Sequence, residues 1–194
     1  PILPLCDAAL FPKMVLPLVV MQSESIQLID EAMAKDRIIG LLVSNKQENV
    51  RPDPEGDLAK VGCSALILKM AKSEDNKAQL LVQGLSRFEA KRFIEGKSYL
   101  QAKVDHIQDD EGMTNEIEAL MANVTKQFTR IVELSPGLPQ EIGAMANSIK
   151  EPGTLADMVA STINSSTEEK QGVLEALDVM KRLVDTLPCG CSNI

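Results

Sequence analysis

The chain has 194 residues, of which 44% are hydrophobic and 25% are charged. This balance can fill a core and excludes a chain that is disordered throughout. Aromatic residues make up only 3%, so the core must consist mainly of Leu, Ile, Val, Met and Ala. The formal net charge of -8 disfavours nucleic acid and anionic membranes as main partners, because proteins that bind phosphate groups usually carry the opposite charge.

Features of location and redox state point to the cytoplasm. No apolar run approaches the roughly 18 residues that a membrane-spanning helix needs. The opening residues lack the pattern of a secretory signal. The four cysteines are too few and too scattered for a disulfide framework. We therefore expect a cytoplasmic protein with reduced thiols.

Residues 1–110 have the pattern of a β-rich lobe that contains one helix. Ser23 is a favourable N-cap, and apolar residues follow it at helical spacing to Met33. Short apolar or alternating segments, separated by polar turns such as residues 73–77, predict strands. Their number and spacing predict a small barrel or sandwich. The predicted strands cover residues 37–44, 61–70, 78–83, 85–94 and 99–107.

Residues 111–187 predict an all-helical lobe, in which acidic residues outnumber basic ones more strongly than in the first lobe. The polar, acidic segment 109–112 is the predicted junction. Apolar stripes of helical period are broken by Pro-Gly pairs at 136–137 and 152–153. Residues 188–194 are then expected to form a tail.

The last predicted helix begins with a capping box formed by Ser166 and Glu169. Apolar residues behind it step by four and three positions, which predicts one helix with a short heptad seam that ends at Pro188. The seam consists of Val173, Leu177, Met180, Val184 and Leu187.

Motifs for catalysis are weak or missing. The sequence contains no G-x-x-x-x-G-K, G-x-S-x-G or H-E-x-x-H motif. The single histidine, His106, could act as a base for Cys6 or Cys63, but Cys63 is more simply a small core residue. Cys189 and Cys191 supply only half of a tetrahedral metal shell and fit a frayed tail better. We predict no catalytic, cofactor-binding or metal-binding residues in this chain.

The segment from Phe11 to Pro17 fits no regular period and allows two interpretations. In the first, Phe11, Met14, Val15 and Leu16 form an exposed apolar patch that contacts other polypeptides. In the second, the segment is an internal strand and these side chains belong to the core.

Several segments in this order resemble the N-terminal domain of Lon proteases. Leu3-Pro4-Leu5 followed by residues 11–18 resembles the family's "LPLR…FPGMVLPL" opening. Asp57-Leu58 before Val61-Gly62 is similar to its "DLYxVGT", and residues 81–87 resemble "VLVEGLxR". Residues 168–175 resemble "xxEKQxLLE". The resemblance covers residues 1 to about 187.

The sequence departs from the family pattern at three places. Cys6 stands where the family often has arginine, and Lys13 stands where it usually has glycine. The tail 188–194 does not resemble the family, in which a long helix would continue.

The resemblance implies an α+β fold: a small β-barrel-like (PUA-like) lobe with one helix, followed by an all-α lobe. Full-length Lon proteins are cytoplasmic, homohexameric AAA+ serine proteases, and their ATP, magnesium and Ser-Lys dyad belong to downstream domains. This chain would then be a non-catalytic domain that recognises unfolded or damaged polypeptides in protein quality control and supports hexamer assembly. The alternatives are a stand-alone ligand-binding module of the same fold and, less favoured, an independent hydrolase.

Overall fold

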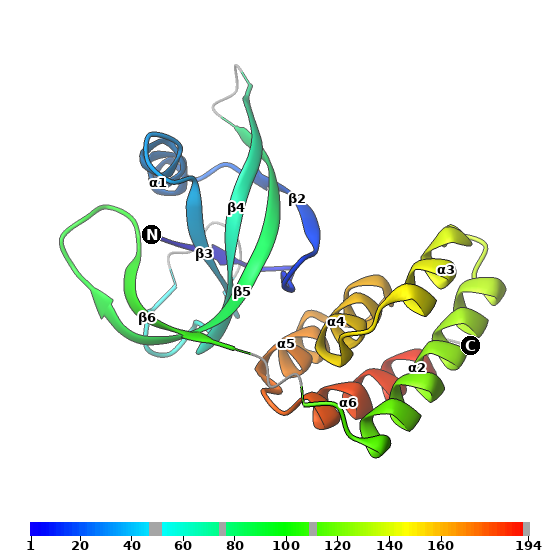
Figure 1. The fold of residues 1–194 in the computed structure, drawn as a ribbon. Helices are drawn as coiled ribbons and strands as arrows, with labels where there is room; N and C mark the ends of the chain where they lie inside the picture. The colour runs from blue at the N-terminus through cyan, green and yellow to red at the C-terminus, as the bar shows by residue number, and fades with distance from the viewer. Residues whose placement is uncertain (47–51, 74–76, 109–111, 192–194) are drawn as a thin grey trace. The chain divides into compact units, whose positions relative to one another are not determined.

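The chain divides into two compact units, Pro1–Gln108 and Asp109–Ile194 (Figure 1). The computed structural model describes residues 1–46, 52–73, 77–108 and 112–191, with the backbone alone for 187–191. The division falls after residue 108, against residue 110 in our prediction. Most of the predicted junction 109–112 and of the predicted turn 73–77 lies outside the described residues.

In its described residues, the first unit consists of a six-stranded mixed sheet and one helix. The strands pair in the order β1-β3-β4-β5-β2, and β6 also pairs with β5. The pairing of β1 with β3 is parallel, and the other pairings are antiparallel. The elements are β1 (Ile2–Leu5), β2 (Val15–Val20), α1 (Ser23–Met33), β3 (Ile38–Val43), β4 (Val61–Lys72), β5 (Ala78–Ile94) and β6 (Gln101–Ile107).

Strand β5 runs without interruption through the position where we predicted a break between two strands. It pairs with β4 along one edge, while β2 and β6 lie end to end along the other edge. Gly84 occupies the predicted break because a Cβ there would lie 2.1 Å from the carbonyl oxygen of Phe11. Register shifts between Ser64 and Ala65 and between Ala90 and Arg92 allow the long strands to bend.

The sheet does not close into the barrel that we expected. Strands β1 and β2 end the pairing path, and no pairing joins them in the described part of the chain. Instead, the N–H of Ile2 donates to the carbonyl of Leu100, just before β6, at 2.8 Å. The α+β class is confirmed, and the PUA-like likeness remains a prediction.

The core of this unit lies between the sheet and α1. Leu28 and Ile29 of α1 are fully buried against apolar side chains of β1, β3, β4 and β5. A second cluster forms around Ile2, Leu42 and Phe88. As the composition predicts, most of these side chains are aliphatic.

The second unit contains five helices in the described residues. Helix α4 lies at the centre of the second unit, since eight of the eleven residues of this helix are buried. The predicted breaks near residues 136 and 152 are confirmed. The helices are α2 (Asn115–Leu134), α3 (Glu141–Ser148), α4 (Pro152–Thr162), α5 (Thr167–Glu175) and α6 (Val179–Cys191).

The predicted continuous heptad seam is wrong. The capping box is present, with the Glu169 N–H donating to Ser166 Oγ at 3.1 Å and the Ser166 N–H donating to Glu169 Oε2 at 2.8 Å. However, the chain breaks between α5 and α6, where the Asp178 carboxylate accepts the Lys181 N–H at 2.7 Å. Leu177 consequently lies 46% exposed.

The predicted stop at Pro188 is also wrong, because α6 continues to Cys191. A proline inside a helix removes one backbone hydrogen bond and crowds the preceding turn, but it does not always end the helix. Residues 192–194 of the predicted tail lie outside the described residues.

Arg182 and Asp157 form a buried ion pair in this unit. Both side chains are almost completely inaccessible, and Nη1 of Arg182 lies 3.9 Å from Oδ1 of Asp157. Nε of Arg182 also donates to the carbonyl of Ala176 at 2.9 Å. The arginine therefore ties α6 both to α4 and to the break after α5.

We expect Arg182→Met to lower the free energy of unfolding by about 3–5 kcal/mol, because it leaves a buried carboxylate without its cation. Urea denaturation followed by circular dichroism measures the change. The double variant Asp157→Leu, Arg182→Met should recover part of the loss. If the double variant loses as much free energy of unfolding as Asp157→Leu and Arg182→Met lose together, the two residues do not act as a pair.

Lys13 adopts a left-handed backbone conformation, with φ of 64°, immediately before β2. Its N–H donates to the carbonyl of Gly84, whose own N–H donates to the carbonyl of Met14. This two-against-one pattern is a β-bulge in which glycine is the preferred first residue. The glycine that the family resemblance leads us to expect at position 13 therefore fits the backbone.

We expect Lys13→Gly to raise the free energy of unfolding by about 0.5–1 kcal/mol. A left-handed conformation costs a residue with a Cβ about 1–2 kcal/mol, and the greater entropy of glycine in the unfolded chain offsets part of this gain. Lys13→Ala keeps the Cβ and is the matched control in urea denaturation. Equal stability of the two variants would contradict this explanation.

Candidate functional site

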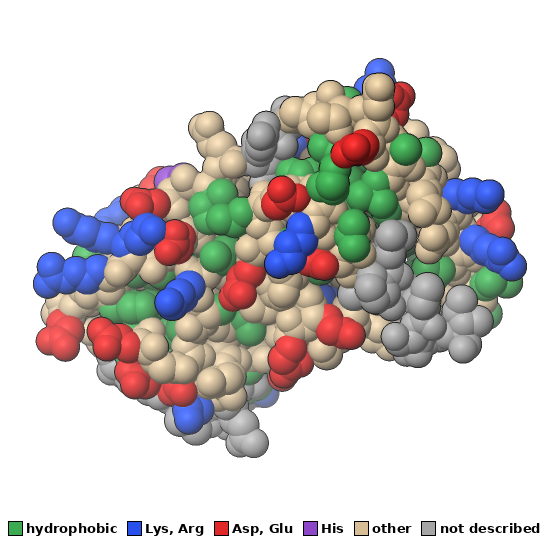
Figure 2. Space-filling view, turned by 90° about the horizontal axis from the view of Figure 1, so that it is seen from below, with side chains coloured by type: hydrophobic (Ala, Val, Ile, Leu, Met, Phe, Trp, Pro, Cys, Tyr) green, Lys and Arg blue, Asp and Glu red, His purple; other side chains and the backbone are tan. Residues whose placement is uncertain are grey.

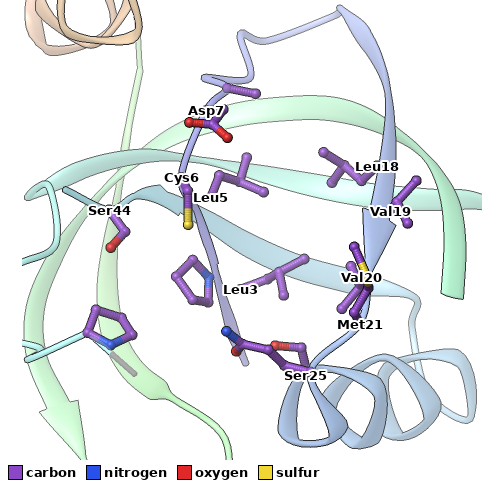
Figure 3. Close-up of a pocket in the computed structure, with 14 residues that line it drawn as sticks. Leu3, Leu5, Cys6, Asp7, Leu18, Val19, Val20, Met21, Ser25 and Ser44 are labelled. Carbon is purple, nitrogen blue, oxygen red and sulfur yellow. The ribbon is translucent and has the colours of Figure 1, made fainter. Parts of the chain in front are cut away.

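A pocket of about 170 Å³ lies at the open side of the sheet, between β1, β2 and the start of α1. Figure 3 shows side chains of β1 and β2 facing this space from its two sides. In the described residues, no strand lies between the two ends of the pairing path, and the pocket occupies this gap. Its apolar side chains include Leu3, Leu5, Leu18 and Val20.

The polar groups of the pocket are few. Ser25 and Ser44 are buried, and the hydroxyl oxygen of Ser44 accepts the N–H of Lys46 at 3.1 Å. Cys6 also lines the pocket, and among the described residues of the lining the charged one is Asp7. A mainly apolar lining with a few polar groups is typical of binding sites for apolar groups.

Exposed apolar side chains continue from the pocket along β2. Val19 and Met21 line the pocket and are 50% and 48% exposed. Val15, on the same face of β2 as Val19, is also 50% exposed. We call Val15, Val19 and Met21 the β2 apolar row. Elsewhere too, hydrophobic side chains reach the surface in groups among charged ones, as Figure 2 shows for one face of the molecule.

The structure divides the predicted patch between core and surface. Phe11 is fully buried, so it is not part of an accessible surface in this conformation. Met14 and Leu16 are partly buried against the main core, and Val15 is half exposed. Phe11 therefore belongs to the core, as the second interpretation holds, but it precedes strand β2 and is not part of a strand. A contact role for the other three residues remains a prediction.

Our predicted patch does not include Val19 and Met21. Exposed and partly buried residues alternate along β2 from Val15 to Val19, and Val20 is buried. Because residues 15–21 are apolar throughout, their sequence does not indicate which side chains reach the surface.

The structure does not support the proposed pairing of a cysteine with His106. Cys63 is buried in the core, and its Sγ donates to the carbonyl of Ser64. His106 is exposed, and its Nδ1 lies 3.2 Å from Oγ of Ser86. Cys6 lies in the pocket lining instead.

Two features are absent from the described part of the chain. No group of three or more His, Cys, Asp or Glu side chains there has the arrangement of a metal site. No helix there combines the length and the apolar character needed to cross a membrane.

A polar cluster holds α1, which forms one wall of the pocket, to the segment before β6. Glu31 of α1 accepts hydrogen bonds from Nζ of Lys97 and from the hydroxyl of Tyr99, the latter at 2.8 Å. Ser98 donates to the side chain of Gln27 at 2.7 Å. The bonds from Lys97 and then Tyr99 lower the pKa of Glu31, and the bond to Glu31 raises the pKa of Lys97.

Comparison with known proteins agrees with the motif resemblance. Residues 1–188 match the family model described as "ATP-dependent protease La (LON) substrate-binding domain". A Lon protease of Desulfosudis oleivorans is 49% identical over 183 residues, and one of Syntrophus aciditrophicus is 49% identical over 190 residues. Each match covers 94% of this chain but only 22% and 24% of the relative, so the chain spans about a quarter of their length.

Solved structures show the same fold. The N-terminal domain of a Mycobacterium avium complex Lon protease superposes with a TM-score of 0.80 at 23% identity, covering 100% of this chain and 98% of that chain. A Lon N-terminal domain protein from Xanthomonas campestris superposes with a TM-score of 0.68 at 17% identity, covering 97% and 96%.

Glu31 should contribute to stability in a pH-dependent way. Because its pKa is lowered in the folded state, its contribution is present above its ordinary pKa of 4.5 and is lost as the pH falls through the folded value. We expect Glu31→Gln to lower the melting temperature near pH 7 and to flatten its decline in acid. Lys97→Gln should have the same effect, and the double variant should add little. An unchanged acid profile in Glu31→Gln would contradict this role.

Proposed function

Because the chain belongs to the family of LON substrate-binding domains, we propose that it recognises unfolded or damaged polypeptides for an ATP-dependent protease. The observation that carries the proposal is the apolar pocket at the open side of the sheet, bordered by the exposed side chains of the β2 apolar row. Native proteins bury most of their large apolar side chains, whereas unfolded chains expose them. An accessible apolar pocket therefore distinguishes the two states of a substrate.

The size of the pocket suits a single large apolar side chain. Cavities of about 150 Å³ lined by apolar residues accept a benzene ring, and this pocket measures about 170 Å³. Full burial of one Leu or Phe side chain contributes about 1.5–3 kcal/mol, which the entropic cost of association largely offsets. Binding at one such pocket is consequently weak and short-lived. Short-lived binding suits a domain that transfers its substrate to a protease.

Charge supports apolar over electrostatic recognition. The chain carries a net charge of -8, and among the described residues of the pocket lining the charged one is Asp7. Binding should therefore depend only slightly on salt, since screening acts on charge pairs and not on apolar contacts.

The proposal extends to the longer protein. Relatives that carry this domain are named Lon protease, which supports a cytoplasmic, homohexameric AAA+ protease in which this domain also aids assembly. We propose that ATP, magnesium and the catalytic residues act outside this chain, because its sequence lacks a G-x-x-x-x-G-K loop. In this domain the sheet, though open, would correspond to the barrel-like, PUA-like lobe.

We expect the double variant Val19→Asp, Met21→Asp to weaken binding to a permanently unfolded protein, such as a reduced and alkylated one, by about tenfold or more. It removes two apolar contacts and places two carboxylates at the mouth of the pocket. Fluorescence anisotropy measures the dissociation constant. The melting temperature should change little, because both side chains are half exposed.

Leu134→Asp provides a matched control. Leu134 is 59% exposed and lies in the second unit. It should bind the unfolded protein as the unsubstituted chain does. Equal weakening by Leu134→Asp, or unchanged binding by the double variant, would remove the pocket from the proposed function.

A further inference from the structure

The two strands that border the pocket, β1 and β2, are edge strands at the two ends of the pairing path, and each carries a proline. Pro17 lies in the middle of β2, and Pro4 lies in the middle of β1. An unpaired sheet edge is normally a template on which another extended chain can add as a strand. The direction in which each proline faces therefore determines what the edges can bind.

On β2 the hydrogen-bond pattern directs Pro17 outward. The bulge at Lys13 and Met14 bonds to Gly84, and the register then pairs Leu16 with Val82 and Leu18 with Leu80. In an antiparallel ladder, bonded and non-bonded pairs alternate. Leu16 and Leu18 therefore bond to β5, while the backbone of Val15, Pro17 and Val19 faces the free edge.

On β1 the parallel ladder directs Pro4 outward in the same way. The N–H of Gly40 donates to the carbonyl of Pro1, and the N–H of Ser44 donates to the carbonyl of Leu5. Odd-numbered residues of β1 therefore face β3. The outward N–H of Ile2 already bonds to Leu100, and Pro4 is the next outward residue.

We propose that Pro4 and Pro17 prevent an extended polypeptide from adding as a strand in the gap between β1 and β2, so that the pocket binds side chains without a backbone ladder. Each proline lacks an N–H at an outward position, and its ring occupies space that a neighbouring strand about 4.8 Å away would need. Neither proline removes a hydrogen bond from the sheet, because the backbone of each faces away from its paired strand. The part of this inference that concerns dissociation of a bound unfolded polypeptide rests on the proposed function.

The two prolines allow apolar side chains to be exposed at a sheet edge that does not readily pair with another strand. A domain that meets unfolded chains needs exposed apolar side chains, but an open edge beside them invites tight strand pairing and aggregation. With the edges blocked at their centres, a bound segment contributes only side-chain contacts. Such a segment dissociates quickly and need not have a particular backbone conformation.

The first test needs no substrate. Pro17→Val restores an N–H at the outward position and keeps a side chain typical of strands. We expect this variant, and more strongly Pro4→Val combined with Pro17→Val, to self-associate at concentrations at which the unsubstituted chain does not, as measured by sedimentation velocity. Pro136→Val, in the exposed loop between α2 and α3, is the matched control and should behave as the unsubstituted chain.

The second arm measures dissociation of an unfolded, alkylated protein. We expect Pro17→Val to slow it on the order of tenfold, the effect of about one added backbone hydrogen bond to a charge-free partner. Loss of binding by the unsubstituted chain would contradict the proposed function but leave the first arm intact. Unchanged self-association together with an unchanged dissociation rate would overturn the inference.

Hydrogen exchange on the unsubstituted chain tests the geometry even if the variants fail to fold. The amides of Val15 and Val19 should exchange much faster than those of Leu16 and Leu18. Equal protection of the four amides would show that the edge of β2 is already paired and would overturn the inference.

Discussion

The length of β5 is the constraint on which the first unit depends. At 17 residues it exceeds every strand that pairs with it, so one edge accommodates both β2 and β6 in succession. A strand of this length must twist and bend, and the register shifts against β4 and β6 provide the bends. The bend brings the two ends of the pairing path to either side of one pocket without joining them. The open edge and the pocket are thus consequences of the same strand.

Most strands were predictable because their side chains follow the period of a sheet and their turns are polar. Strand β1 was not predicted, and a strand was only one of two interpretations of the segment that leads into β2. Pro4 and Pro17 normally argue against a strand, and only the pairing geometry shows that both face away from the paired strand. The break between α5 and α6 was equally hidden, since apolar residues continue at heptad spacing across it. At this break the buried Arg182 donates to the carbonyl of Ala176. The spacing of the apolar residues does not indicate that the helix ends there.

The candidate site was harder to predict than the fold, for a related reason. Apolar character alone does not show which side of a strand a residue occupies, so Phe11 was a reasonable surface candidate until its backbone was found packed against Gly84. The pocket combines residues of β1, β2, α1 and the segment after β3. No local pattern connects these segments. Their proximity follows from the order of the strands, which the sequence does not display without a relative.

The proposed recognition of unfolded chains would impose conflicting demands on a surface, because exposed apolar side chains must stay accessible without causing aggregation. Val19 and Met21 provide apolar contact beside the pocket. Glu31 and Lys97 keep α1 against the sheet, so that the pocket retains its wall when it is empty. A preformed pocket avoids the entropic cost of ordering its own side chains at each encounter. Under the proposed function, the small pocket would bind one side chain at a time, so selectivity would come from several weak contacts along a substrate.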